Sequence, residues 1–282
     1  MAQISLIIQA RTTSTRLPQK VLKPLPYNSD TTVLEQVISR ANKCRMVNEV
    51  IVATTTDEED NQIVKIAEKN SVRYFRGSRD DVLSRYYFAA KMAKADVIVR
   101  VTSDCPCIDP EVIDRLITHH INGGFHYSSN TIKRTFPHGL DAEVFNFDVL
   151  EEAHFYANKL YEREHVCPYM HTTNKDKFKL GFIEAQKEEF APDIRITLDT
   201  EEDYALLCSV FDYLYDKDNF FNAADIVRLF EEKPWLKIIN KKIVQKKTFT
   251  DVNEEIKEAI RVLDLQELKN ASKFLKNVFI KQ

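Results

Sequence analysis

The chain has 282 residues, 44% of them hydrophobic, and a formal net charge of −3 at pH 7. This length allows one large domain or two modest ones with a packed core, and the near-neutral charge excludes a basic field for nucleic acid. No run approaches 18 apolar residues, so we expect no membrane span. The segment Ile4–Ile8 is too short for a signal-peptide core, and five cysteines without a C-x-x-C pair favour reduced thiols in a cytoplasmic protein.

Strand and helix patterns alternate through the first half of the chain. Apolar and β-branched runs predict strands at Ile4–Gln9, Val50–Thr54, Arg73–Phe75 and Val97–Thr102. Apolar spacing and capping residues predict helices around Val33–Ala41, over Glu58–Asn70, from Asp80 or Asp81 to about Ala95, and from Asp109-Pro110 onward. The alternation predicts an α/β fold with a Rossmann-like, mainly parallel sheet and helices on both faces.

The second half is less regular. We expect Phe125–Ser129 and Asp141–Phe147 to be strands that pair outside the main sheet. Further strands are predicted at Phe178–Glu184 and Ile194–Leu198, and helices at Glu151–Asn158, Glu162–His171, Thr200–Tyr215 and Ala223–Glu232.

The composition changes near residue 240. Residues 240–282 hold ten basic and six acidic residues, and apolar residues such as Ile256, Ile260 and Leu263 recur at helical intervals. This pattern predicts an amphipathic helix that packs on the body or a partner, with contact to an anionic surface as the alternative. We therefore divide the chain into a main α/β domain, 1–240, and a basic amphipathic helical extension, 241–282.

The first predicted strand leads into a loop that holds three cations, Arg11, Arg16 and Lys20, among several hydroxyls. Open α/β sheets bind ligands at the carboxyl ends of their strands, and guanidinium and ammonium donors match phosphate oxygens. The loop is neither a Walker P-loop nor a dinucleotide fingerprint, because both glycine patterns are missing. It is therefore either a polyphosphate cradle built from side-chain cations or a solvated loop with scattered charge.

Two aspartates follow predicted strands. Asp104 comes after Val97–Thr102, and Asp199 comes after Ile194–Leu198 and directly before a helix. Proteins hold Mg²⁺ with one or two carboxylates plus phosphate oxygens of the substrate, so the pair would complete a nucleoside triphosphate site. The alternative is that Asp104 caps a turn and Asp199 caps a helix.

A further polar segment, Pro137–Glu143, lies in a region of apolar patterning, with Arg163-Glu164-His165 downstream. It is a candidate wall for a second substrate. Five histidines cluster between His126 and His171, but no spacing among them matches a metal site.

Several of these segments, taken in order, resemble the SpsF-like members of the cytidylyltransferase superfamily, which also contains CMP-sugar synthetases. The resemblance covers about Ile4 to Tyr215. Its motifs are Gln9–Lys20, Val50–Thr55, Tyr74–Ser78, Asp81–Leu83, Asp104–Pro106, Gly139–Asp141, Glu143–Phe145, Arg163–His165 and Leu198–Thr200.

The resemblance implies a nucleotidyltransferase that uses CTP and Mg²⁺, has the fold of the nucleotide-diphospho-sugar transferases and often forms homodimers. By carry-over, the catalytic residues are Arg11, Arg16, Lys20 and Asp104, and the metal ligands are Asp104 and Asp199. The nucleotide would be bound by Gln9, Ala10, Arg11, Lys20, Thr54, Arg76, Gly77 and Ser103. The acceptor would be bound by Gly139, Asp141, Glu143 and Arg163.

The chain departs from the family pattern at four positions. Thr13, Gln19 and Ser103 stand where the family usually has glycine, and His138 stands where it often has aspartate. The first three affect the phosphate cradle, and His138 bears on the identity of the acceptor.

The expected reaction is attack of an acceptor oxygen on the α-phosphorus of CTP, with release of pyrophosphate. Two alternatives remain at this point. A nucleotide-sugar-dependent glycosyltransferase commonly has an Asp-x-Asp metal motif, whereas this chain reads Ser103-Asp104-Cys105. A nucleotide-binding module without catalytic activity is the other alternative.

Overall fold

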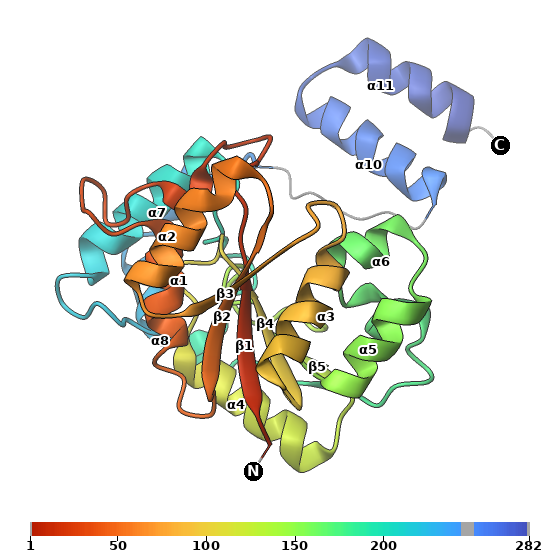
Figure 1. Cartoon of the computed structure of the whole chain (residues 1–282). Coiled ribbons are helices and arrows are strands. Elements are labelled where there is room, and N and C mark those ends of the chain that lie inside the picture. Colours follow the sequence, from red (N-terminus) through yellow and green to blue (C-terminus); the bar gives the residue numbers. More distant parts are fainter. Residues whose placement is uncertain (1, 244–250, 281–282) are drawn as a thin grey trace. The chain divides into compact units, whose positions relative to one another are not determined.

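A seven-stranded sheet with strand order β3-β2-β1-β4-β6-β5-β7 forms the centre of the molecule (Figure 1). The computed structural model describes residues 2–243 and 251–280. Strands β1 to β4 are parallel, β6 runs antiparallel to β4 and β5, and β7 is parallel to β5. The strands are β1 Ile4–Gln9, β2 Glu49–Thr55, β3 Arg73–Gly77, β4 Val97–Thr102, β5 Tyr127–Ser129, β6 Glu143–Asn146 and β7 Leu180–Phe182.

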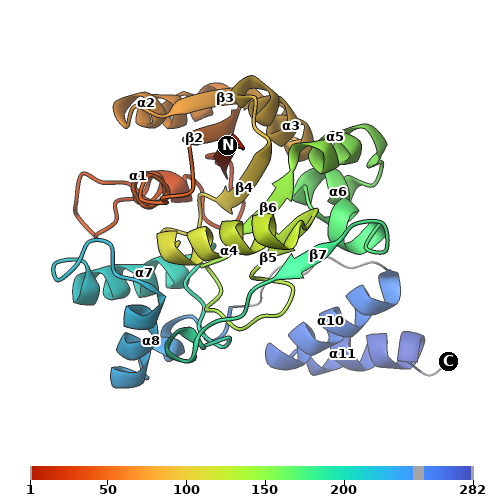
Figure 2. The ribbon, with the colours of Figure 1, turned by 90° about the horizontal axis from the view of Figure 1, so that it is seen from below.

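Helices cover both faces of the sheet, since α1 and α2 lie on one side of the central strands and α3 and α5 on the other (Figure 1). Helix α4 packs on β5, β6 and β7 (Figure 2). The helices before residue 243 are α1 Val33–Ala41, α2 Asn61–Lys69, α3 Val82–Ala93, α4 Pro110–Gly123, α5 Phe147–Tyr156, α6 Leu160–His165, α7 Glu201–Leu214, α8 Ala223–Glu232 and α9 Leu236–Ile239.

The two-residue alternation of β1 explains this layering. Leu6 and Ile8 are fully buried in a core cluster with residues of α1, α2 and α4, whereas Ile7 lies in a second cluster with residues of α3 and α5. Because successive side chains of a strand point to opposite faces, a continuous apolar run requires helices on both sides. A third cluster contains residues of α7 and α8, residues 194–198 and Leu17. Because Leu17 belongs to the loop after β1, this cluster anchors that loop to the protein core.

The predicted mainly parallel sheet with helices on both faces is confirmed, and so are the capped starts of α3 and α4. Asp81 accepts a hydrogen bond from the Ser84 amide, and Asp109 caps α4 with Pro110 in its first turn. The expectation that Phe125–Ser129 and Asp141–Phe147 pair outside the main sheet is wrong. These segments form β5 and β6, and β6 joins the sheet by pairing with β4.

Two further element predictions need correction. Residues 194–198 form no strand, and only one parallel bridge joins Arg195 to His138. The helix expected at Glu162–His171 is interrupted, because Val166 has a φ of 68° and Pro168 follows it. A β-branched residue in this conformation and a proline both end an α-helix, and a π-helical turn, Tyr169–Thr173, follows.

The chain divides into two compact units, Met1–Lys241 and Lys242–Gln282. In the second unit, α10 (Val252–Leu265) packs against α11 (Lys269–Leu275), and Lys276 Nζ lies 2.8 Å from Asp264 Oδ2. Among the described residues, no helix is long and apolar enough to cross a membrane.

Candidate functional site

Lys20 joins two carboxylates at the carboxyl edge of the sheet. Its Nζ lies 2.8 Å from Asp104 Oδ2 and 2.9 Å from Asp199 Oδ1, and it donates to the Leu198 carbonyl at 2.8 Å. Because both carboxylates bond the same nitrogen, their oxygens lie within two hydrogen-bond lengths of each other. The structure therefore brings together three residues that the sequence assigned to one site, and we call them the Lys20 cluster.

Two arginines complete the surroundings of Asp199. Arg16 Nη2 lies 3.0 Å from Asp199 Oδ1, and Arg195 Nη2 lies 2.8 Å from Asp199 Oδ2. Arg195 also binds Asp203, whose carboxylate accepts from the amides of Asp199 and Thr200 and closes the capping box of α7. Sequence reasoning missed Arg195, although an arginine inside the apolar run 194–198 was a usable signal.

The charges of the Lys20 cluster stabilise one another. Burial by itself would raise the pKa of Asp104 and of Asp199, but the Lys20 ammonium beside them holds both pKa values below the usual range. Burial would lower the pKa of Lys20, and the two carboxylates raise it instead. All three groups are therefore charged at neutral pH.

A buried carboxylate, Asp60, anchors the loop after β1 to the end of β2. Its Oδ1 accepts from the Thr12 amide at 2.8 Å and the Thr12 hydroxyl at 2.7 Å. Its Oδ2 accepts from the hydroxyls of Thr55 at 2.6 Å and Thr54 at 3.1 Å. Asp60 was also missed from the sequence, where it looks like part of an acidic helix start.

The backbone of the same loop has a left-handed conformation at one residue. Gln19 adopts a φ of 55°, a left-handed conformation that glycine adopts at lower cost. Ala10 and Ser103 donate backbone hydrogen bonds to Ala53 and Gln9, so both lie at the ends of the central strands. Arg11 is exposed on this loop.

The residues of β2 and β3 that were predicted to bind the nucleotide contact neighbouring protein groups. Thr54 is fully buried and bonded to Asp60. Arg76 donates to the carbonyls of Thr55 at 2.9 Å and Asp57 at 2.8 Å and to Asn61 Oδ1 at 2.7 Å. Gly77 ends β3, where a Cβ atom would lie 2.9 Å from Arg85 Cγ.

Among the residues predicted to bind the acceptor substrate, Asp141 forms a bidentate ion pair with Arg134. His138 Nε2 lies 3.7 Å from Asp141 Oδ2, and His138 Nδ1 lies 3.2 Å from Arg195 Nη1. These contacts connect Asp141 through His138 and Arg195 to Asp199. Burial lowers the pKa of His138, which favours a neutral ring.

Gly139 makes this connection possible. It has a φ of 119°, and a Cβ atom would lie 2.7 Å from the Ile196 carbonyl carbon and oxygen. The backbones of residues 139 and 196 therefore approach each other more closely than any side chain would allow.

Glu143 and Arg163 form other contacts. Glu143 pairs with the half-buried Arg100 and accepts from the Tyr127 hydroxyl at 2.7 Å. Arg163 pairs with Asp81 at the start of α3 and donates to the His154 carbonyl at 2.6 Å. Among the described contacts, none joins Arg163 to the Lys20 cluster.

The donor set of the Lys20 cluster fits Mg²⁺ in one respect. Asp104 and Asp199 present two carboxylates at one point, which is the protein share of a site that phosphate oxygens complete. Within residues 2–243 and 251–280, no group of three or more His, Cys, Asp or Glu side chains is placed to hold a metal ion by itself. A metal at this point would therefore depend on a bound substrate.

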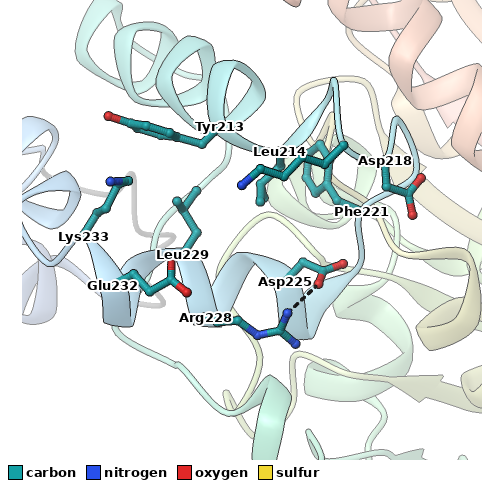
Figure 3. A pocket seen from close by; sticks show the side chains of 10 residues that line it. Tyr213, Leu214, Asp218, Phe221, Asp225, Arg228, Leu229, Glu232 and Lys233 are labelled. Atoms are coloured by element: carbon teal, nitrogen blue, oxygen red, sulfur yellow. Dashed lines mark ion pairs between the residues drawn. The ribbon is translucent and has the colours of Figure 1, made fainter.

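A separate pocket of about 190 Å³ lies between α7 and α8 (Figure 3). Arg228 and Asp225 line this pocket and form an ion pair, with Arg228 Nη1 3.5 Å from Asp225 Oδ1. Its lining contains no residue of the Lys20 cluster, so it does not contribute to the candidate site. The lining residues are Tyr213, Leu214, Lys217, Asp218, Phe221, Asp225, Arg228, Leu229, Glu232 and Lys233.

Comparison with known proteins assigns this arrangement to a family. The family model described as cytidylyltransferase matches residues 5–243, which include all three residues of the Lys20 cluster. The chain belongs to the cytidylyltransferase family. It is an SpsF-like cytidylyltransferase, so it is an enzyme that transfers a nucleotidyl group from CTP.

Three relatives of this cytidylyltransferase cover most of its length. The spore coat polysaccharide biosynthesis protein SpsF of Bacillus subtilis is 32% identical over 236 residues, which is 83% of this chain and 96% of SpsF. An uncharacterized protein of Methanocaldococcus jannaschii is 38% identical over 248 residues, 88% of this chain and 98% of that protein. The structure of a cytidylyltransferase from Leptospira borgpetersenii aligns with a TM-score of 0.78 at 33% identity, covering 89% of this chain and 100% of that one.

Proposed function

We propose that this cytidylyltransferase joins CMP from CTP to a sugar acid or a related small-molecule acceptor, with Mg²⁺, and releases pyrophosphate. The convergence of Lys20, Asp104 and Asp199 within hydrogen-bond distance supports this proposal most directly. The name of the SpsF relative supports a role in cell-surface polysaccharide or glycan biosynthesis.

In the proposed reaction, an acceptor oxygen attacks the α-phosphorus of CTP, and the bond between the α-phosphorus and the bridging oxygen of the leaving pyrophosphate breaks. Lys20, Arg16 and Arg11 bind the triphosphate and stabilise the charge that accumulates on the pyrophosphate. The buried hydroxyl of Thr13 has no partner among the described residues and is a further donor for a phosphate oxygen. Asp104 and Asp199 would hold Mg²⁺, which would supply charge neutralisation for the phosphate oxygens.

Lys20 must change partners when the triphosphate binds. In the structure its ammonium forms ion pairs with both aspartates, and Arg16 supplies a second positive charge to Asp199. A phosphate oxygen that takes over Lys20 leaves the two carboxylates free to act as ligands.

The acceptor is proposed to lie beside Asp141, His138 and Arg195. Arg134 and Arg195 are half-buried cations on this side, and they suit the carboxylate of a sugar acid. Asp141 would accept a hydrogen bond from an acceptor hydroxyl and so orient the attacking oxygen.

The test is pyrophosphate release with CTP, Mg²⁺ and a panel of sugar acids, sugar phosphates and polyol phosphates. We expect Lys20→Ala and Asp104→Ala each to lower kcat by roughly 100-fold or more, because each removes a charge that the transition state needs. Lys65→Ala, an exposed lysine on α2, is the matched control. Near wild-type turnover in both site variants would overturn the proposal.

We also propose a homodimer. Side chains on neighbouring helices form an exposed apolar face, with Phe155, Tyr156 and Leu160 exposed by 65%, 70% and 88%. Beneath this face the buried Tyr87 packs against Phe155, with ring centroids 5.9 Å apart. Light scattering of the wild type and of Leu160→Asp tests it, since a monomeric wild type would contradict the proposal.

A further inference from the structure

Arg85 is a buried cation that the proposed reaction does not yet use. It lies on α3 and is 2% exposed. Within the described part of the chain, its Nε and Nη1 atoms are buried and have no hydrogen-bond partner. Burying an unpaired charge is costly, so a guanidinium with free N–H groups calls for an explanation.

The second deeply buried arginine shows how this fold satisfies such a group. Arg40 is fully buried and its Nε also lacks a hydrogen-bond partner among the described residues, but its Nη1 donates to the Phe221 carbonyl at 2.9 Å, and its guanidinium stacks on the Phe221 ring at 4.3 Å. Arg40 is therefore a structural residue that ties α1 to the segment before α8. Arg85 has no comparable set of partners.

The position of Arg85 relates it to the nucleotide site. Its side-chain stem reaches Gly77 at the carboxyl end of β3, and α3 packs on β1, β2 and β3. Its charge interacts with Arg11 of the loop after β1 and with Asp57 and Asp60 after β2, and burial lowers the pKa of the guanidinium. The guanidinium thus belongs to the same sheet edge as the Lys20 cluster.

The strand order then indicates which end of a nucleotide lies near Arg85. Lys20 and Asp104 place the phosphates over β1 and β4, and Arg85 lies on the other side of β1, toward β2 and β3. From β4 to β3 is three strand spacings, roughly 14 Å, which an extended nucleoside triphosphate can span. A triphosphate held by Lys20 therefore has its base on the side of Arg85.

We propose that Arg85 selects cytosine by donating two parallel N–H groups, Nη2 together with Nε or with Nη1, to O2 and N3 of the base. This inference rests on the proposed function, which places the phosphates at Lys20. A planar guanidinium donates two parallel hydrogen bonds to two adjacent acceptors, and cytosine presents such a pair. Uracil has a donor at N3, so the same guanidinium meets N–H against N–H and rejects UTP.

The experiment compares the wild type with Arg85→Met and Arg40→Met by calorimetric titration with CTP and with UTP, in Mg²⁺ and without acceptor. Arg85→Met keeps the apolar stem and removes the donors. We expect it to lower the ratio of CTP to UTP affinity by about 10- to 100-fold without lowering Tm. Arg40→Met should lower Tm and leave the ratio unchanged. Arg85→Lys, which keeps the charge but loses the planar donor pair, should lower the ratio as well.

The possible failures are distinguishable. An unchanged CTP-to-UTP ratio in Arg85→Met and Arg85→Lys, with a preference for CTP in the wild type, overturns the role of Arg85 and leaves the proposed function intact. A wild type that binds neither nucleotide overturns the proposed function and this inference with it. A lower Tm in Arg85→Met with an unchanged ratio in both variants identifies Arg85 as a structural residue.

Discussion

Lys20 Nζ and Asp104 Oδ2 lie 2.8 Å apart although 84 residues separate them in the chain. The contact closes the gap between the loop after β1 and the turn after β4, two neighbouring parallel strands. It also pairs the opposite charges of a half-buried ammonium and a half-buried carboxylate. Several consequences for metal binding, pH and stability can be measured.

Removal of Lys20 should strengthen metal binding in the absence of nucleotide. In the wild type the ammonium competes with a cation for Asp104 and Asp199. Lys20→Ala leaves two neighbouring carboxylates without this charge, so we expect Mn²⁺ affinity to rise by roughly tenfold or more. Titration calorimetry with Mn²⁺ measures it, and the double variant Lys20→Ala/Asp104→Asn should return the affinity to the wild-type level. Unchanged Mn²⁺ affinity in Lys20→Ala would show that the carboxylates are not metal ligands.

Asp199 should contribute to stability at neutral pH and lose this contribution in acid. Its pKa is lower in the folded protein than the ordinary value of 3.8, so the folded state binds its proton less tightly than the unfolded state. The contribution is therefore complete above the ordinary pKa and disappears as pH falls through the folded pKa. We expect Asp199→Asn to lower Tm most at pH 7, and the difference from wild type to shrink below about pH 4. Asp216→Asn, in an exposed loop, is the control. A Tm difference that stays constant between pH 7 and pH 3 contradicts this assignment.

Gly139→Ala should destabilise the acceptor side. The new Cβ atom would lie 2.7 Å from the Ile196 backbone, and the φ of 119° is unfavourable for alanine. We expect a loss on the order of 2–3 kcal/mol in the free energy of unfolding by urea, together with lower turnover, because His138 is held by the same segment. Gly124→Ala is the matched control, since Gly124 also has a positive φ of 56° but lies in open space. Its cost should be about 1 kcal/mol without a change in turnover. Equal effects of the two variants would show that the close approach is unimportant.

Asp60→Ala should loosen the phosphate loop. The buried donors on Thr12, Thr54 and Thr55 would lose their shared acceptor, which costs about 2–4 kcal/mol in unfolding free energy. We also expect KM for CTP to rise more than kcat falls, because the loop that carries Arg11 and Lys20 becomes less ordered. Steady-state kinetics at several CTP concentrations separate the two effects. Glu59→Ala, an exposed neighbour, should be neutral in both measurements. A stable Asp60→Ala protein with an unchanged KM would remove Asp60 from the site.

The local pattern of the sequence determined the framework of the site. The alternating apolar runs of β1, β2 and β4 predict a parallel sheet buried on both faces, and parallel strands bring their carboxyl ends to one edge. Lys20 and Asp104 could therefore be assigned to one place from strand ends alone, whereas the assignment of Asp199 depended on a strand at residues 194–198 that the structure does not contain. The helix-capping roles of Thr200 and Asp109 could also be predicted, since helix capping depends on residues within one turn.

Only the tertiary structure decided the contacts between distant segments. Asp60 accepts a hydrogen bond from Thr12 in the loop after β1, 48 residues away in the sequence. Arg195 contacts His138, which is 57 residues away in the sequence. Arg163 forms an ion pair with Asp81 and not with the Lys20 cluster. Strand β6 belongs to the main sheet because it pairs with β4, and its short sequence pattern does not specify that pairing. Apolar periodicity specifies which face of a segment is buried, because that depends on neighbouring residues. The partner of a buried charge depends on which segments the completed fold places beside it, and no local pattern carries that information.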